Sequence, residues 1–169
     1  MTTGQVKILK IAWKALMSKV CVLSQRVPYP PNKGEKLRTY HQIEFLIRLG
    51  YEVEVFSLIE TAEDKKNAEA LAKHLGISVN SYQLGSKFTR YASALLQGLP
   101  ISVGAFYSKR LQHVIDEKLK EGKDALLLTA SSLSYYIFNS PYYNTTHCRL
   151  FMDFMDVDSD KWAQYADSS

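Results

Sequence analysis

The sequence is short of the features that define several large classes of protein. Its 169 residues include two cysteines, Cys21 and Cys148, too few for a disulfide framework. There is no secretory signal and no apolar run of about 18 residues, so we predict a cytoplasmic protein without a membrane-spanning segment. The glycine fingerprint of NAD-binding domains, the Walker phosphate loop and the serine-hydrolase elbow motif are also missing.

Charge is distributed unevenly along the chain. The formal net charge is +4, but residues 1–50 hold nine Lys and Arg against two Glu, whereas residues 150–169 hold five Asp against one Lys. This distribution, without a zinc-finger or RNA-binding signature, argues against a nucleic-acid partner. We interpret the basic N-terminal third as suited to a phosphate-bearing ligand or an anionic membrane surface.

Residues 1–16 stand apart from the rest of the chain. Apolar residues are interleaved there with Lys7, Lys10 and Lys14, a pattern that fits either a strand or a basic amphipathic helix at a membrane interface. A third interpretation is that Met17 is the natural first residue and that residues 1–16 are a start-site artefact. On each of these interpretations the domain is predicted to span residues 17–169. Peripheral contact with the inner face of the membrane is kept as an alternative.

Beyond this extension, short apolar segments alternate with amphipathic ones. The predicted strands are residues 20–23, 51–58, 77–84, 125–130 and 149–154, and the predicted helices are residues 33–49, 61–75, 86–97, 108–121, 131–138 and a last one after Ser159. This alternation predicts an α/β, Rossmann-like open parallel sheet with helices on both faces. Because the last helix has barely begun at Ser169, we also expect a truncated domain, a fragment of a longer protein.

The segment between the first predicted strand and the next helix is the strongest candidate for a binding site. Three prolines within residues 28–31 prevent a strand or helix from running through it. Asn32 and Glu35 have the spacing of a capping box, which predicts Lys33 as the first helical residue. In an open α/β sheet, ligands bind at such a junction of strand end and helix start.

The first turn of that helix is suited to an anion. Gly34 lets a ligand approach the backbone closely. The free N–H groups of a helix start, together with Lys33, Lys36 and Arg38, favour a phosphate group. An ordinary helix start with solvated lysines accounts for the same residues, and the spacing alone does not decide between the two interpretations.

A short acidic run follows the fifth predicted strand at the same edge. Asp156-Val157-Asp158 fits either a metal-binding Asp-x-Asp that holds a nucleotide diphosphate or, for Asp158, the cap of the next helix. We favour the cap for Asp158 and keep Asp156 as a candidate ligand contact. None of the histidines pairs by spacing with a metal ligand, and no metal site is predicted.

Three blocks of the sequence resemble a known family. Residues 26–38, 98–103 and 152–162 read RVPYPPNKGEKLR, GLPISV and MDFMDVDSDKW. They are similar to segments of the sugar transferases associated with the PEP-CTERM/exosortase system. Those enzymes are family 4-like glycosyltransferases of the GT-B architecture, which has two Rossmann domains. The blocks occur in the family's order, and the resemblance covers roughly residues 17–169.

The resemblance implies that two domains bind different substrates. In this family the N-terminal Rossmann domain mainly binds the acceptor, while a C-terminal Rossmann domain, missing here, holds most of the nucleotide-sugar site. The glycine that approaches the donor phosphates would correspond to Gly34, and the loop after the fifth strand to Asp156. Many relatives place a histidine-aspartate pair near such a loop; this sequence has no histidine there, so the catalytic residue is unassigned. No cofactor is implied, because the nucleotide-sugar is a co-substrate, and GT-B enzymes generally need no metal.

Two hypotheses about function follow. The first is the N-terminal part of a glycosyltransferase that moves a sugar from a nucleotide-diphosphate donor to a glycan or lipid-linked acceptor in exopolysaccharide or cell-surface glycan synthesis. On this hypothesis the chain alone is expected to be inactive. The second is a non-catalytic, flavodoxin-like α/β module that binds a ligand or another protein.

Overall fold

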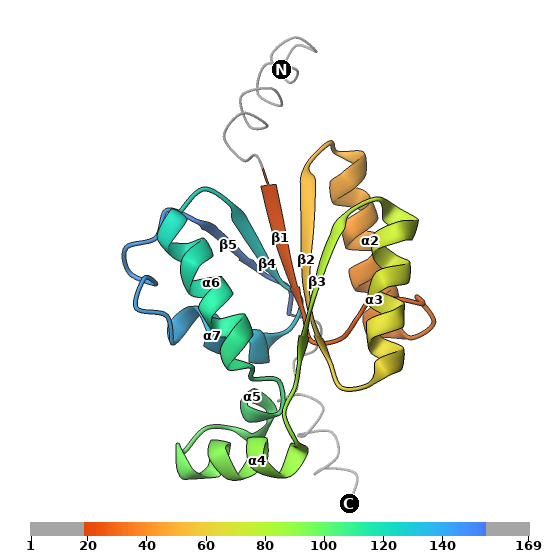
Figure 1. Ribbon diagram of the computed structural model, residues 1–169. Helices are drawn as coiled ribbons and strands as arrows, with labels where there is room; N and C mark the ends of the chain where they lie inside the picture. The colour runs from red at the N-terminus through yellow and green to blue at the C-terminus, as the bar shows by residue number, and fades with distance from the viewer. Residues whose placement is uncertain (1–18, 155–169) are drawn as a thin grey trace, which may run out of the picture.

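The computed structural model describes residues 19–154, which form a five-stranded sheet with helices on both sides (Figure 1). The strand order is β3-β2-β1-β4-β5, and every neighbouring pair is parallel. This is the strand order of Rossmann-like sheets, in which the winding reverses between β1 and its neighbour β4. The predicted fold class is therefore confirmed.

All five strands lie within the predicted segments or within one residue of them. They are β1 (Lys19–Ser24), β2 (Glu52–Ile59), β3 (Ser78–Gln83), β4 (Ala125–Leu128) and β5 (Arg149–Met152). The strands β4 and β5 are shorter than predicted. The chain leaves the sheet after Leu128 and after Met152, although the N–H of Thr129 still donates to the carbonyl of Leu23 at 3.1 Å and that of Asp153 to the carbonyl of Leu128 at 2.9 Å.

The helices agree with the predicted periodic segments, with one addition. They are α2 (Gly34–Arg48), α3 (Ala62–Leu75), α4 (Lys87–Leu96), α5 (Ile101–Ala105), α6 (Lys109–Glu121), a 3-10 turn (Ser131–Leu133) and α7 (Ser134–Phe138). The sequence did not indicate α5, because its five residues are too few to show helical periodicity. Within residues 19–154, no helix has the length and apolar character needed to span a bilayer.

The two faces of the sheet have separate cores. Along β1, Val20 and Val22 face α2 and α3, whereas Cys21 and Leu23 face α6 and α7. This alternation follows from the two-residue period of a strand. The short helices α4 and α5 lie beyond the carboxyl end of the sheet (Figure 1).

The predicted capping box at the start of α2 is wrong. Lys33, not Asn32, is the N-cap residue, Gly34 is the first helical residue, and no side chain caps this helix. Asn32 is instead held in a turn, where its N–H donates to the carbonyl of Pro30 at 2.9 Å. A capping box does occur at the start of α3, between Thr61 and Asp64.

A network of ion pairs lies near the amino end of the sheet, on the face covered by α6. Lys118 Nζ is 3.3 Å from Glu54 Oε2 and 3.1 Å from Asp124 Oδ2, and Lys19 Nζ is 2.9 Å from Glu54 Oε2. Asn80 donates to Glu54 Oε1 at 2.8 Å. Burial disfavours the charged form of Glu54, but the two lysines outweigh it, and the pKa of Glu54 is lowered.

Both cysteines are free thiols. Cys21 is fully buried in β1, and burial raises the pKa of its thiol to about 12. Cys148 is half-buried, and its Sγ lies 3.2 Å from the carbonyl oxygen of Lys118. A buried thiol with a raised pKa is a poor nucleophile, so Cys21 acts as a core residue.

Candidate functional site

A polar cavity of about 410 Å³ opens at the carboxyl edge of the sheet, and we call it the carboxyl-edge cavity. It is formed by the loop after β1, the first turns of α2 and α3, the ends of β2 and β3, and the helices α4 and α5. Its charged lining residues are Arg26, Lys33, Lys36, Glu60, Asp64, Lys87 and Arg90. In sheets of this topology, this edge is where ligands bind.

The first turn of α2 contributes two of the predicted site residues to this cavity. Lys33, the N-cap residue, and Lys36, in the first turn, both line it. Gly34 lies between them, and a Cβ added there would meet nothing within 4 Å, so the space in front of its backbone is open. Since no side chain caps α2, the partial positive charge of the helix start is available to a ligand.

Arg38, also predicted to face a phosphate, is not among the residues that line the cavity. Its guanidinium forms an ion pair with the carboxylate of Asp153, just after β5. Gln42, one turn further along α2, donates to the other oxygen of that carboxylate at 2.6 Å. Arg38 comes two positions after Lys36 in the helix, which turns their side chains to different sides. Arg38 therefore ties α2 to the end of β5.

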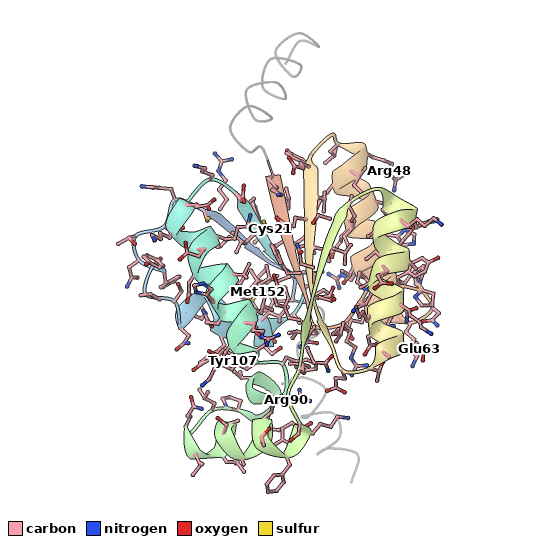
Figure 2. The ribbon with its side chains drawn as sticks, viewed as in Figure 1. Cys21, Arg48, Glu63, Arg90, Tyr107 and Met152 are labelled. Atoms are coloured by element: carbon pink, nitrogen blue, oxygen red, sulfur yellow. The ribbon has the colours of Figure 1, made fainter. Side chains whose placement is uncertain are left out.

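Arg90, on α4, is the central buried charge of the cavity. Only 9% of its surface is exposed. Its Nη2 donates to Glu60 Oε1 at 2.6 Å, and its Nη1 donates to the carbonyl of Ala105 at the end of α5. Figure 2 shows Arg90 at the junction of the sheet with these two helices. Its hydrogen bond to Glu60 is the main reason that the pKa of Glu60 is lowered.

The start of α3 forms the opposite wall. Burial disfavours the charged form of Asp64, but the N–H groups of Glu60 and Thr61 donate to its carboxylate at 3.0 and 2.9 Å, and its pKa is lowered. Asp64 is therefore an ionised carboxylate with a structural role as a cap. The cavity wall carries five cationic side chains against the two carboxylates of Asp64 and Glu60. This excess favours an anionic ligand.

The loops after β1 and β4 meet at the point where the strand order reverses. Gln25 Nε2 donates to Ser132 Oγ across this point. Gln25 also lines the carboxyl-edge cavity. The cavity therefore extends to the place where the strand order reverses, between β1 and β4. The hydrogen bond shows that the loops after β1 and β4 lie side by side at the carboxyl edge.

The acidic run and the last predicted helix fall outside the part of the chain that the structure describes. Asp156, Asp158 and the helix expected after Ser159 lie outside the described residues 19–154. In that described part, no group of three or more His, Cys, Asp or Glu side chains is placed to hold a metal ion.

Glu60, Lys87 and Arg90 belong to the cavity but were not predicted from the sequence. Arg90 follows a serine cap in a helix that ends in apolar residues, and nothing in that pattern distinguishes it from a solvated surface arginine. Its burial depends on Glu60 and Ala105, which lie 30 and 15 residues away in the chain. Only the tertiary structure brings them together.

Comparisons with known proteins add no relatives: no protein-family model, no curated protein and no solved structure matches this chain. The fold and the cavity thus define the molecule as a Rossmann-like α/β protein with a cationic cavity at the carboxyl edge of its sheet.

Proposed function

We propose that this chain is the N-terminal, acceptor-side domain of a GT-B glycosyltransferase. The complete enzyme would move a sugar from a nucleotide-diphosphate donor to a glycan or lipid-linked acceptor in exopolysaccharide or cell-surface glycan synthesis. The observation that carries the proposal is the carboxyl-edge cavity, where Lys33, Lys36 and the uncapped start of α2 face a common space. Such a wall suits the phosphates of a nucleotide-sugar.

The three sequence blocks that resemble the family support the proposal by their positions. The first block contributes Lys33 and Lys36 to the cavity. The second includes Pro100, the N-cap of α5, the helix whose last carbonyl binds Arg90. The third begins at the end of β5, where Asp153 binds Arg38 of the first block. The described parts of the three blocks, which include residues 152–154 of the third, therefore lie at one edge of the sheet.

The residues take the following roles in the proposal. Lys33, Gly34 and Lys36 face the phosphates, and Arg38 holds the end of β5 against α2. Asp156, outside the described residues, contacts hydroxyls of the sugar or of the acceptor. A C-terminal Rossmann domain completes the donor site, and the catalytic residue is not assigned.

Binding of UDP or inorganic pyrophosphate to the isolated chain tests the cavity directly. We expect weak binding, in the millimolar range, because one wall of a two-domain cleft offers only part of the contacts. Replacing Lys33 and Lys36 together by alanine is expected to weaken the binding about thirtyfold, since each charge-assisted contact contributes about 1 kcal/mol. Titration followed by NMR chemical shifts of the α2 amides measures both effects.

The matched control removes two exposed lysines that do not line the cavity, Lys73 and Lys123. It makes the same change in net charge and should leave the affinity unchanged. If both double variants lost the same affinity for UDP or pyrophosphate, the binding would reflect general charge attraction, which would contradict a phosphate site at α2. Tight binding of FMN instead of UDP would favour the flavodoxin-like alternative.

On this proposal the isolated chain is expected to show no sugar transfer, because most of the nucleotide-sugar site would be supplied by a second Rossmann domain. The measurement is release of nucleotide diphosphate from several nucleotide-sugars, with a glycan and a lipid-phosphate acceptor present. Turnover by these 169 residues alone would overturn the two-domain proposal. The genomic DNA after codon 169 provides an independent check, since the proposal requires a reading frame that encodes a second Rossmann domain.

A further inference from the structure

A second cavity, of about 450 Å³, lies between α4, α5 and the start of α6, and we call it the α6 cavity. It shares only Leu84 and Arg90 with the carboxyl-edge cavity, so the two are different spaces that meet at Arg90. Its lining contains three cations, Arg90, Lys109 and Arg110, and no Asp or Glu. Figure 2 shows Arg90 and Tyr107, which both line it, below the sheet. The volume is in the range of pockets that hold small molecules.

The start of α6 has no internal stabilisation. Ser108 is the N-cap residue, but its side chain makes no capping hydrogen bond, and the first turn contains no acidic residue. The helix begins instead with Lys109 and Arg110, whose positive charges oppose the positive end of the helix dipole. Neither cation forms an ion pair within residues 19–154. An anion bound at this helix start would compensate the dipole and both cations.

Two buried polar groups of the cavity lining lack a partner. Ser108 is only 8% exposed; its N–H donates to the hydroxyl of Tyr136 at 2.7 Å, but its own hydroxyl forms no hydrogen bond in the described part of the chain. The outer nitrogens of Arg90 are bound to Glu60 and Ala105, whereas its buried Nε has no partner among the described residues. A buried polar group that stays unsatisfied costs free energy, and a ligand that reaches it removes that cost.

We propose that the α6 cavity binds the phosphate group of a small, hydroxyl-rich molecule. The free N–H groups at the start of α6 and the hydroxyl of Ser108 would donate to the phosphate oxygens. Lys109 and Arg110 would supply the countercharge, and an arginine fork matches the geometry of a phosphate. The two carboxylates of the carboxyl-edge cavity, Glu60 and Asp64, do not line this one, so nothing in the lining repels an anion.

The rest of the lining indicates what the phosphate is attached to. A phosphate alone fills only part of a cavity of about 450 Å³. Neutral hydrogen-bonding side chains line much of the remainder, namely Gln83, Thr89, Ser93, Gln97 and Tyr135. Their amide and hydroxyl groups both donate and accept, which suits the hydroxyl groups of a ligand. Leu99 and Tyr107 add apolar surface for its carbon skeleton. A sugar-sized phosphate ester fits this lining better than the free ion.

This inference goes beyond the proposed sugar transfer and does not depend on it. Lys33 and Lys36 line the carboxyl-edge cavity and are absent from the lining of the α6 cavity. The variant with alanine at both positions is therefore expected to weaken the binding of UDP and to leave binding in the α6 cavity unchanged. The two proposals can fail separately.

Titration of the full chain with glucose 6-phosphate, followed by NMR chemical shifts of the first α6 amides, tests the proposal. We expect saturable binding that is at least about tenfold tighter than that of inorganic phosphate and of glucose. Replacing Lys109 and Arg110 together by alanine is expected to weaken it at least about tenfold. The variant should fold, because it removes two charges that oppose the helix dipole.

Ser108→Ala distinguishes a binding role from a structural one. An N-cap serine that stabilises its helix lowers the melting temperature when it is replaced by alanine. Here the side chain makes no capping bond, so the melting temperature without ligand should not fall. The affinity for glucose 6-phosphate is expected to fall about threefold or more, through loss of one hydrogen bond to the phosphate. A lower melting temperature with unchanged affinity would contradict the proposal.

The matched control replaces Arg48 and Lys73, which are exposed and line neither cavity, by alanine. It makes the same change in net charge and should leave the affinity for glucose 6-phosphate unchanged. Equal loss in the control, or no saturable shift in the wild type, overturns the proposal. So does inorganic phosphate that binds as tightly as the ester. Binding that is lost in the Lys33 and Lys36 variant but kept in the Lys109 and Arg110 variant would assign the ligand to the carboxyl-edge cavity instead.

Discussion

Replacing Lys118 by methionine is expected to lower the free energy of unfolding by about 2 to 4 kcal/mol. The ammonium group lies between the carboxylates of Glu54 and Asp124, at 3.3 and 3.1 Å, in a largely buried position. Removing one partner of a buried ion pair leaves uncompensated charge in a medium of low dielectric constant, which is costly. In the variant, Glu54 would still form its ion pair with Lys19. Asp124 shows no ion pair other than that with Lys118 in the described part of the chain. Urea denaturation at neutral pH measures the loss.

The neighbouring variant Lys120→Met is the control. Its ammonium is exposed and 3.9 Å from Glu117, and such surface pairs contribute less than about 1 kcal/mol.

The pH dependence of the free energy of unfolding distinguishes the loss of an ion pair from the loss of packing. Because the folded-state pKa of Glu54 lies below its ordinary value of 4.5, its ion pairs stabilise the fold above that value and are lost as pH falls through the folded pKa. The difference between wild type and Lys118→Met should shrink in acid; a constant difference would indicate packing alone.

Replacing Gly104 by alanine is expected to separate α5 from α4 and to destabilise this part of the molecule by about 1 to 3 kcal/mol. The new Cβ would lie 2.3 Å from the Cβ of Ala94 and 3.2 Å from the carbonyl oxygen of Arg90, neither of which can rotate away. The resulting shift of α5 would move Ala105 away from Arg90. Hydrogen exchange of the α4 and α5 amides, compared with that of β1, measures the local loss.

Gly85→Ala is the control for this substitution. Its added Cβ would meet only Thr89 Oγ1, at 3.9 Å, and it should be close to neutral. Unchanged exchange in Gly104→Ala would mean that the two helices have room to adjust. Exchange that is faster in α4 and α5 but unaltered in β1 would confirm that these helices form a separate, weaker unit.

The sheet could be predicted from the sequence because β1, β2, β4 and β5 are short, largely apolar segments, while β3, which is mostly polar, lies between Gly76 and Gly85. Gly50, Gly76 and Gly122 follow α2, α3 and α6 with φ of 83°, 65° and 67°, the left-handed conformation that glycine adopts readily at helix ends. The start of α2 was harder to predict. The spacing of Asn32 and Glu35 is that of a capping box, but a turn closed by Pro30 engages Asn32 first.

The candidate site was only partly predictable. Lys33 and Lys36 follow from a local pattern, the start of a helix after a strand. Arg38 is in the same block, yet the rotation of the helix directs it to Asp153, 115 residues away in the chain. No local pattern encodes such a pairing, just as none encodes the burial of Arg90. Local sequence therefore indicates which edge of the sheet is used, while tertiary contacts decide which charges face the cavity.

The central position of β1 has a consequence for synthesis on the ribosome. One of its neighbours, β2, follows after a single helix, but the other is β4, and Val20 pairs with Ala125 only after α6 has been made. Until then the first three strands and their helices can assemble with one edge of β1 unpaired. That edge runs along the most apolar strand segment of the N-terminal half, residues 20–23. An unpaired apolar edge can pair with a neighbouring nascent chain, so translation exposes this fold to misassembly for longer than a sheet built in sequence order.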